Sequence, residues 1–301
     1  MSITSVRQFD RGDLDELFRL TERIRQDPPA FRGLAAPYVL ATLFYEPSTR
    51  TRLSFEAAMA RLGGHVISTE NAAEMSSAVK GETLADTVRI VSGYADVIAL
   101  RHYEAGASDV AARAARVPVI NAGDGAGEHP TQALLDAFTV AHYRGGLDDL
   151  VITFVGDLAY GRTVHSLALL LTRFRGVRIR FVAPERLAAP AWLVGQLEAA
   201  GIDVRPVATL ADAAAESDVL YVTRVQTERF PSGLDPADTT YTVEPEVLDR
   251  LPPHALILHP LPRVQELPPA VDADPRARYF DQAAFGLYVR MALLGRALGV
   301  L

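Results

Sequence analysis

The 301-residue sequence contains no cysteine. This absence excludes disulfide frameworks, thiol catalysis, zinc sites with cysteine ligands and iron–sulfur clusters. Lysine is almost absent as well: Lys80 is the single lysine among 30 basic residues, and the others are all arginine. A compact ammonium on a flexible stem differs chemically from a planar guanidinium. Lys80 therefore has two open interpretations. Either it marks a position where arginine cannot substitute, or it is a lysine that an arginine-biased genome has left by chance.

Basic residues are fewer than acidic residues, and the sequence has no long apolar run. With 37 acidic and 30 basic residues the net charge is −7, which argues against a general nucleic-acid binder, although a local basic site remains open. The longest apolar runs, such as 167–171, fall far short of the roughly 18 residues that span a bilayer. Residues 1–27 are polar and carry no apolar core of a secretory signal. We expect a soluble, cytoplasmic protein with no membrane segment and no nucleic-acid partner.

What is present is an alternation of short apolar runs with helical patterns, in a composition that is 49% hydrophobic and 22% charged. Strands are predicted over 38–45, 65–68, 96–100, 117–121, 151–155, 177–182, 204–207, 218–222 and 255–258. Helices are predicted over 48–62, 82–94, 104–116, 130–143, 163–174, 191–200 and 282–298. This order predicts an α/β protein with two doubly wound parallel-sheet domains and a C-terminal helix that returns to the first domain.

A domain boundary is expected at the helix over 130–144 and the Gly145-Gly146 pair that follows it. The first domain would then comprise residues 1–145, joined by the C-terminal helix over 282–301. The second would comprise residues 146–281. This division agrees with the length, which favours two domains.

Three local predictions accompany this organisation. Residues 72–79 are small and polar and are predicted to form a loop. Residues 230–242 are rich in Pro, Gly and Asp and are predicted to form a mobile loop. Within the helix over 48–62, the apolar spacing predicts an inner side made of Leu53, Ala57, Met59 and Ala60.

In open parallel sheets, ligands bind beyond the carboxyl ends of the strands, so the polar residues at those ends are informative. The stretch 48–52, Ser-Thr-Arg-Thr-Arg, follows a strand and opens a helix. Its hydroxyls, Arg50 and the helix N–H groups suit a phosphate. An ordinary N-cap with exposed arginines is the alternative, but two arginines between the hydroxyls favour an anion site. Arg101 closes a neighbouring strand.

The Gly-rich stretch 123–132 precedes another helix and contains His129. Its spacing is not GxGxxG, so a dinucleotide cofactor is disfavoured. In the second half of the chain, Arg162 and Arg224 stand at helix and strand edges and could clamp two carboxylates. Each alone fits a surface arginine, but together with the first-half arginines they predict a doubly anionic set of substrates. No cluster has metal-ligand spacing, so neither a metal nor a cofactor is expected.

Six strings occur in a recognisable order: FYEPSTRTRLSFE (44–56), SSAVKGETLADT (76–87), NAGDGAGEHPTQALLD (121–136), GDLAYGRTVHS (156–166), TRVQTERF (223–230) and HPLPRVQE (259–266). Together they resemble the catalytic chains of the aspartate carbamoyltransferases, within the aspartate/ornithine carbamoyltransferase family. The resemblance implies a carbamoyl-phosphate domain followed by an aspartate domain. It implies transfer of a carbamoyl group from carbamoyl phosphate to L-aspartate, which yields N-carbamoyl-L-aspartate and phosphate in pyrimidine (UMP) biosynthesis. It also implies homotrimers whose active sites are shared between subunits.

Carried over motif by motif, the resemblance implies a carbamoyl-phosphate site made of Ser48, Thr49, Arg50, Thr51, Ser76, Lys80, Arg101, His129, Gln132 and the backbone of Leu261. It implies an aspartate site made of Lys80, Arg162, Arg224 and Gln226. The residues with catalytic roles would be Arg50, Thr51, Lys80, Arg101, His129 and Gln132. Ser76 and Lys80 would come from the neighbouring subunit, and Glu82 would pair with Arg50.

Two alternatives remain beside this interpretation. Ornithine carbamoyltransferases share the phosphate half but carry an HCLP string, where this chain has HPLP at 259–262. The run Arg224-Val225-Gln226 also suits a second carboxylate better than an ornithine ammonium. A catalytically silent scaffold subunit of a pyrimidine-pathway complex should have lost phosphate ligands, whereas Ser48 to Thr51, Lys80 and His129 are all present. Whether regulatory chains or a dihydroorotase bind is left open by the sequence.

Overall fold

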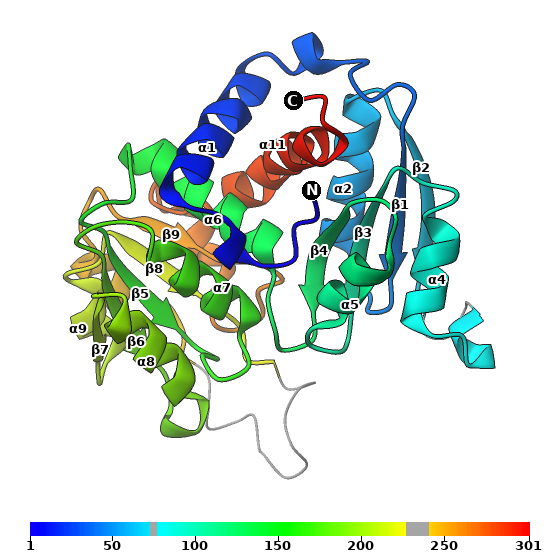
Figure 1. Ribbon diagram of the computed structural model, residues 1–301. Coiled ribbons are helices and arrows are strands. Elements are labelled where there is room, and N and C mark those ends of the chain that lie inside the picture. Colours follow the sequence, from blue (N-terminus) through cyan, green and yellow to red (C-terminus); the bar gives the residue numbers. More distant parts are fainter. Residues whose placement is uncertain (73–76, 227–240) are drawn as a thin grey trace. The chain divides into compact units, whose positions relative to one another are not determined.

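The computed structural model describes residues 1–72, 77–226 and 241–301, which contain two parallel sheets (Figure 1). The first sheet has the order β2-β1-β3-β4 and consists of β1 (Val39–Phe44), β2 (His65–Glu70), β3 (Val97–His102) and β4 (Val119–Asp124). The second has the order β7-β6-β5-β8-β9 and consists of β5 (Val151–Val155), β6 (Arg178–Val182), β7 (Asp203–Pro206), β8 (Val219–Val222) and β9 (Leu256–Leu258). The paired strands run parallel throughout. The predicted fold class is confirmed.

Helices connect these strands. The α-helices are α1 (Arg11–Gln26), α2 (Thr49–Arg61), α4 (Leu84–Val91), α5 (Ala107–Ala114), α6 (Pro130–Arg144), α7 (Arg162–Leu171), α8 (Ala191–Ala199), α9 (Leu210–Ala214), α10 (Pro245–Arg250) and α11 (Tyr279–Leu298). Short 3-10 helices are η1 (Val6–Gln8), η2 (Pro28–Phe31), η3 (Ser77–Lys80), η4 (Glu185–Leu187) and η7 (Pro269–Ala273). The predicted strands and helices are present, with ends that differ by a few residues.

The chain divides into two compact units. The first comprises Met1–Leu134 with Ala284–Leu301, and the second comprises Leu135–Ala283. Helices α6 and α11 each supply residues to both units, and most of the C-terminal helix belongs with the first. In the part of the chain that the structure describes, no helix is both long and apolar enough to cross a membrane.

Strand β1 of the first unit is buried on both faces. On β1, Ala41 and Leu43 join a cluster with Val88 of α4. Leu40 and Phe44, whose side chains alternate with those two along the strand, are also fully buried. A parallel strand covered on both sides needs such a continuous apolar run, and this is why the run over 38–45 was recognisable as a strand.

Helix α2 begins where the sequence predicts, but it buries a different face. Its buried residues are Thr51, Phe55, Ala58 and Met59. Of the predicted inner residues only Met59 is correct, because Leu53 is half exposed and Ala57 and Ala60 are not buried. The buried positions follow the i, i+4, i+7, i+8 spacing of a single stripe. Leu53 lies about 200° around the helix axis from Phe55, and the larger aromatic side chain takes the core position.

Helix α1 is the longest element that the sequence patterns did not predict. Asp10 and Asp13 form a reciprocal cap, since each carboxylate accepts a hydrogen bond from the backbone N–H of the other. The buried positions Leu14, Leu17 and Ile24 recur at helical spacing. The acidic cap followed by this spacing was the available signal. The high charge of the segment obscured it.

Two predicted loops fall partly outside the described residues. The structure does not describe residues 73–76 and 227–240, so the predicted loop over 230–242 lies there except for its last two residues. The predicted loop over 72–79 differs at its C-terminal end, where the described residues form η3.

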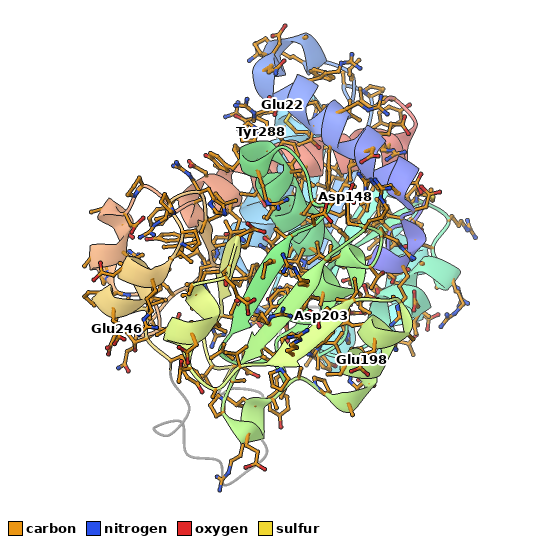
Figure 2. The ribbon with its side chains drawn as sticks, turned by 90° about the vertical axis from the view of Figure 1, so that its left-hand side faces the viewer. Glu22, Asp148, Glu198, Asp203, Glu246 and Tyr288 are labelled. Carbon is orange, nitrogen blue, oxygen red and sulfur yellow. The ribbon has the colours of Figure 1, made fainter. Side chains whose placement is uncertain are left out.

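The second sheet carries a buried arginine near its edge strand. The Arg180 guanidinium on β6 lies 3.2 Å from the carboxylate of Asp203 on β7, which is labelled in Figure 2, and 2.8 Å from that of Glu216. Arg180 is buried, and a buried charge is tolerated only when it is paired. The contact with Asp203 therefore links β6 to β7, and the contact with Glu216 links β6 to the segment between α9 and β8.

Candidate active site

In each sheet, one pair of neighbouring strands is not consecutive along the chain, and the strand order reverses there. In the first unit this is the boundary between β1 and β3, and in the second it is the boundary between β5 and β8. In doubly wound sheets, ligands bind beyond the carboxyl ends of the strands at such switch points. Some of the predicted site residues lie on or after these four strands: 48–51 after β1, Arg101 on β3, Arg162 after β5 and Arg224 after β8.

The start of α2 has the features of an anion site. Ser48 is the N-cap residue in an extended conformation, and within the described chain its side chain makes no capping hydrogen bond. The first turn carries no acidic side chain. Thr51 is buried, while Thr49 and Arg50 are exposed or half-exposed. The first N–H groups of a helix together with these hydroxyls can bind a phosphate.

The two arginines of this stretch have different roles. The Arg52 guanidinium lies 2.8 Å from the Glu70 carboxylate and 3.6 Å from that of Glu56. It also donates to the Ser68 hydroxyl at 3.2 Å. Arg52 therefore ties α2 to β2, and Arg50 is the arginine that α2 exposes in its first turn.

Arg101 stands at the end of β3 beside the loop that follows β1. Its backbone carbonyl accepts a hydrogen bond from the N–H of Tyr45 at 2.8 Å. Its guanidinium lies 3.1 Å from the Glu46 carboxylate and donates to the carbonyl of Ala122 at 3.4 Å. The side chain is therefore held at the carboxyl edge of the sheet.

The Gly-rich loop before α6 is organised by two carboxylates. Asp124 accepts hydrogen bonds from the Glu128 N–H at 2.8 Å and from the Ser108 hydroxyl at 2.9 Å. Glu128 in turn accepts one from the Ser5 hydroxyl at 2.6 Å. Burial raises the pKa of Glu128, although the hydrogen bond from Ser5 opposes the shift. This arrangement fixes the loop immediately before His129.

His129 is buried at the start of α6. Its Nδ1 lies 3.5 Å from the hydroxyl of Thr131, and the Arg290 guanidinium lies 3.5 Å from the same hydroxyl. Arg290 is itself buried and lies over the ring of Phe55, 5.2 Å from its centroid. Gln132, one residue beyond Thr131, is partly exposed. A buried cation close to His129 adds positive potential to this edge of the first unit.

Lys80 and its neighbours occupy the segment between β2 and α4. Lys80 is the last residue of η3 and is exposed. Ser76 lies outside the described residues. Glu82 accepts a hydrogen bond from the hydroxyl of Thr87 at 2.6 Å, and its predicted pairing with Arg50 stays a prediction.

In the second unit, Asp157 joins the loops that follow β5 and β8. Its carboxylate accepts hydrogen bonds from the N–H of Tyr160 at 2.9 Å and from the N–H of Gln226 at 3.0 Å. The Gln226 side chain donates to the Tyr160 carbonyl at 3.1 Å. Asp157 is fully buried. The sequence patterns assigned Asp157 no role, and its place directly after a strand, in Gly156-Asp157, was the available signal.

A close backbone approach accompanies this link. Gly156 has a φ of +112°, and a Cβ at this position would lie 2.2 Å from the carbonyl oxygen of Thr223. Only glycine fits such a contact. It sets the spacing of the β5 and β8 ends just before Asp157 and Arg224.

Arg162 begins α7 and is buried, whereas Arg224 is partly exposed. Arg224 donates to the carbonyl of its neighbour Val225 at 3.1 Å. His165, one turn after Arg162, is buried and its Nε2 lies 2.8 Å from the carbonyl oxygen of Leu158. Burial lowers the pKa of His165, so it is a neutral donor that holds the start of α7 to the preceding loop.

Leu261 follows β9, which pairs with β8. Its N–H donates to Nδ1 of His259 at 2.8 Å. Among the residues that the structure describes, no group of three or more His, Asp and Glu side chains is placed to hold a metal ion.

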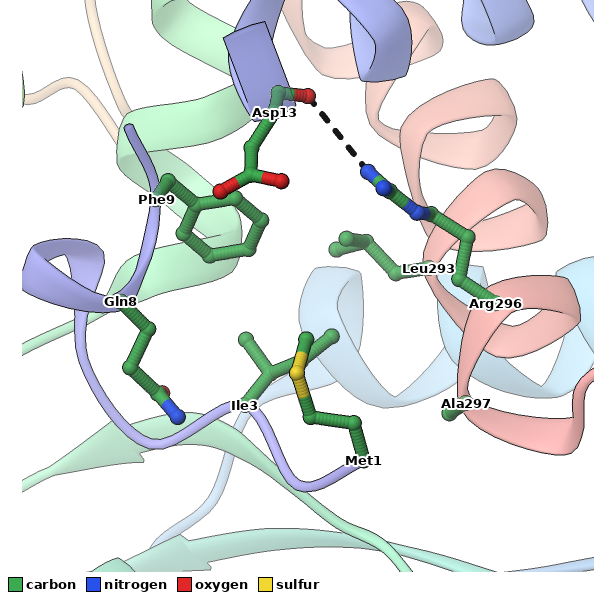
Figure 3. A pocket seen from close by; sticks show the side chains of 8 residues that line it. All are labelled: Met1, Ile3, Gln8, Phe9, Asp13, Leu293, Arg296 and Ala297. Carbon is green, nitrogen blue, oxygen red and sulfur yellow. Dashed lines mark hydrogen bonds between the residues drawn. The ribbon is translucent and has the colours of Figure 1, made fainter. Parts of the chain in front are cut away.

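A small cavity of about 80 Å³ lies elsewhere in the first unit (Figure 3). Its lining includes Phe9 of the N-terminal segment and Leu293 of α11, and Arg296 donates to the carbonyl of Asp13 beside it. Of the predicted site residues that the structure describes, none lines this cavity.

Comparison with known proteins assigns both halves of the chain. Residues 1–142 match the family profile described as aspartate/ornithine carbamoyltransferase, carbamoyl-P binding domain. Residues 148–296 match the profile described as aspartate/ornithine carbamoyltransferase, Asp/Orn binding domain.

Individual relatives cover nearly the whole chain. The sequence is 50% identical to aspartate carbamoyltransferase 3, chloroplastic, of Pisum sativum, over 97% of this chain and 76% of that protein. It is 48% identical to the aspartate carbamoyltransferase catalytic subunit of Methanocella arvoryzae, over 99% of this chain and 97% of that protein. The structure is similar to that of aspartate transcarbamoylase from Trypanosoma cruzi in complex with carbamoyl phosphate and aspartate, with a TM-score of 0.91, 41% identity and coverage of 97% and 95%.

Proposed function

This chain belongs to the aspartate/ornithine carbamoyltransferase family, and on that premise we propose that it carbamoylates L-aspartate. The reaction consumes carbamoyl phosphate and releases N-carbamoyl-L-aspartate and phosphate. The observation that carries the proposal is the placement of anion-binding groups at both switch points. The α2 start and Arg101 supply them in the first unit, and Arg162 and Arg224 supply them in the second.

Carbamoyl phosphate is assigned to the first unit. Ser48, Thr49, Arg50 and Thr51 surround the helix start and bind the phosphate, and Arg101 contacts the phosphate and the carbonyl oxygen. His129 and Thr51 polarise the carbonyl, Gln132 binds the amide nitrogen, and the Leu261 backbone contacts the carbamoyl group. The buried Arg290, whose guanidinium lies 3.5 Å from the Thr131 hydroxyl, supports this role of His129, since its positive charge favours a polarised carbonyl oxygen nearby.

Aspartate is assigned to Arg162, Arg224 and Gln226, with two guanidinium groups for its two carboxylates. The α-amine attacks the carbamoyl carbon, a tetrahedral oxyanion forms, and phosphate departs. Such a reaction is accelerated by orientation of the reactants and by donors aimed at the developing oxyanion. Arg101, His129 and Thr51 are the donors that this chain offers.

The domain assignment remains part of this proposal. Residues 1–145 with 282–301 would form the carbamoyl-phosphate domain, and residues 146–281 the aspartate domain. The absence of cysteine and the HPLP string at 259–262 support aspartate over ornithine, and the relatives described above are named for aspartate. Retention of Ser48 to Thr51, Lys80 and His129 argues against a silent scaffold. The pathway proposed is pyrimidine biosynthesis. The cytoplasmic location stays a prediction, since the pea relative is named chloroplastic.

A side-by-side assay tests this function. Purified protein is supplied with carbamoyl phosphate and either L-aspartate or L-ornithine, and the carbamoylated product is quantified. We expect turnover with aspartate and at most trace turnover with ornithine. Robust ornithine turnover would contradict the substrate assignment, and no turnover with either substrate would favour the scaffold alternative.

A homotrimer with shared active sites is proposed as the assembly. Ser76 and Lys80 would be supplied by a neighbouring subunit, which agrees with the exposure of Lys80 in its own chain. Mixing inactive Lys80→Ala and His129→Ala proteins should restore part of the activity, because some sites then combine two intact halves. No recovery after verified subunit exchange would argue against sharing.

A further inference from the structure

Leu261 has an unusual backbone conformation. In the part of the chain that the structure describes, three residues other than glycine have positive φ: Asn71, Asp149 and Leu261. Asparagine and aspartate adopt this conformation readily because their short polar side chains bond locally, whereas leucine does not. A leucine with a φ of +55° persists only where the surrounding structure holds it there.

The contacts that hold Leu261 begin with His259. The Leu261 N–H donates to Nδ1 of His259 at 2.8 Å, so this nitrogen carries no proton. The proton is therefore on Nε2, which lies 2.9 Å from Oε1 of Glu266. The same oxygen accepts a hydrogen bond from the Val264 N–H at 2.9 Å. These bonds fix His259 in one tautomer and one orientation.

A second set of bonds connects His259 to two helices. The His259 N–H donates to Oε1 of Gln282 on α11 at 2.9 Å. The Gln282 Nε2 donates to Asp136 on α6 at 2.5 Å, and Asp136 also accepts from the Tyr221 hydroxyl at 2.8 Å. Asp136, Gln282 and His259 are all buried, so no solvent replaces a lost partner.

The direction of these bonds depends on Asp136. An ionised carboxylate only accepts hydrogen bonds, while a side-chain amide has one accepting end and one donating end. Asp136 therefore forces the NH₂ end of Gln282 toward itself. The carbonyl end of Gln282 then faces His259, where an acceptor is needed. Burial and the charge of Asp136 both raise the pKa of the Tyr221 hydroxyl, so Tyr221 remains a donor.

We propose that Asp136 and Gln282 are positioning residues for the carbamoyl group, because they orient His259 and thereby hold the Leu261 backbone in its binding conformation. This inference rests on the proposed function, in which the Leu261 backbone contacts the carbamoyl group. Asp136 and Gln282 themselves touch no substrate in this scheme.

Two ligands separate this role from a general effect on folding. Phosphonoacetamide carries a phosphonate and a carboxamide, whereas inorganic phosphate has no counterpart of the carbamoyl group. In Asp136→Asn, the NH₂ group introduced at position 136 faces either the NH₂ group of Gln282 or the hydroxyl of Tyr221, so that two hydrogen-bond donors meet. In Gln282→Glu, two carboxylates face each other. We expect each variant to raise the Kd for phosphonoacetamide about tenfold, as loss of a buried hydrogen bond does, and to leave the Kd for phosphate within about twofold.

The paired variant D136N/Q282E provides a rescue test. The carboxylate introduced at position 282 can accept from both the His259 N–H and the NH₂ group introduced at position 136. The new amide carbonyl at position 136 can still accept from Tyr221. The hydrogen bonds that join positions 136, 221, 259 and 282 are restored with the same net charge. We expect its phosphonoacetamide affinity and kcat to return to within about threefold of the wild type. Affinity as weak as that of the weaker single variant would overturn the proposal, as would normal phosphonoacetamide binding in both single variants.

A neighbouring contact supplies the matched control. The Tyr143 hydroxyl on α6 donates to Asp281 on α11 at 2.6 Å, one residue from Gln282. Tyr143→Phe removes a bond between the same two helices without touching His259, and it should leave both affinities unchanged. If Gln282→Glu does not fold, Gln282→Met removes the same bonds without adding charge. An inactive wild type would count against the proposed function, whereas an active wild type with unaffected variants would count against this inference alone.

Discussion

The Arg101 guanidinium lies 3.1 Å from the carboxylate of Glu46, at the end of β3 and beside the loop that leads from β1 to α2. Both side chains are mostly shielded from solvent. The ion pair satisfies Arg101 with a carboxylate of the protein at the place where a phosphate is proposed to bind. A phosphate bound as proposed would therefore compete with Glu46 for the same cation.

This competition predicts the effect of Glu46→Gln. We expect the Kd for inorganic phosphate to fall about threefold at low salt, because a partly shielded ion pair of modest strength no longer has to be broken. Titration calorimetry measures it. Glu16→Gln, which removes an ion pair of the same 3.1 Å length with Arg296, should leave phosphate binding unchanged. Unchanged or weaker phosphate binding in Glu46→Gln would contradict the competition.

Lys80 supplies a second prediction. Lys80→Arg keeps the charge but replaces a compact ammonium with a planar guanidinium. Because Lys80 is exposed in its own chain, the fold and thermal stability should be unchanged. We expect kcat to fall by at least about 100-fold if the ammonium acts in the reaction. Steady-state kinetics with aspartate measures it, and near-normal turnover would show that the single lysine is a compositional accident.

Gly156 supplies a third prediction. Gly156→Ala introduces a Cβ that would lie 2.2 Å from the Thr223 carbonyl at a φ of +112°. We expect a loss of at least about 1 kcal/mol in the free energy of unfolding and a higher KM for aspartate, with phosphate binding unchanged. Gly195→Ala in α8, where a Cβ meets nothing within 4 Å, should stabilise the protein by about 0.5–1 kcal/mol. Urea unfolding and kinetics test both, and equal effects of the two variants would refute the steric argument.

Asp272 supplies a fourth prediction, on pH. The Arg263 guanidinium and the Tyr279 hydroxyl hold the pKa of Asp272 at about 2, below its ordinary 3.8. A lowered carboxyl pKa means that the ionised form stabilises the native state. This stabilisation is fully present above pH 3.8 and is lost as the pH falls toward 2. Asp272→Asn should therefore be less stable than the wild type at pH 6, and the difference should shrink as the pH is lowered to about 3.

Chemical denaturation at the two pH values measures this difference. The matched control is Asp15→Asn, which breaks an exposed i,i+4 pair with Arg11 and should cost less than about 0.5 kcal/mol at pH 6. A stability difference for Asp272→Asn that grows at low pH would have the wrong sign and would exclude the ion pair as its cause.

Much of the fold could be predicted from local patterns. The run over 38–45 identified β1 because the sequence of a parallel strand that is buried on both faces is nearly continuously apolar. Helix α2 was recognisable from Ser48 before its start and from Gly63 and Gly64 after its end. Helix α1 was not, because its apolar residues are few and its charged residues dominate the segment. The predicted buried face of α2 was also wrong, since hydrophobicity does not tell which apolar side chain meets the core.

The candidate site shows the same division. The polar residues at strand ends, such as Arg101 and Arg224, were found because strand order places them at one edge of a sheet. The groups that contact the predicted site residues and their neighbours were not predicted. Glu46 pairs with Arg101, Asp157 accepts from the Gln226 N–H, and Gln282 accepts from the His259 N–H. Each of these contacts joins residues that are distant along the chain.

The sequence by itself determined the alternation of strands and helices and the chemistry of the strand ends, because periodicity and residue type are local properties. Which charged and polar groups pair with one another within the protein is known from the tertiary structure alone. It assigned Arg52 to Glu70 and placed Asp157 between two loops. It also joined Asp136 to Gln282 across 146 positions of sequence. Hydrogen bonds form between atoms that are close in space, and no local pattern records which distant donor will meet a given acceptor.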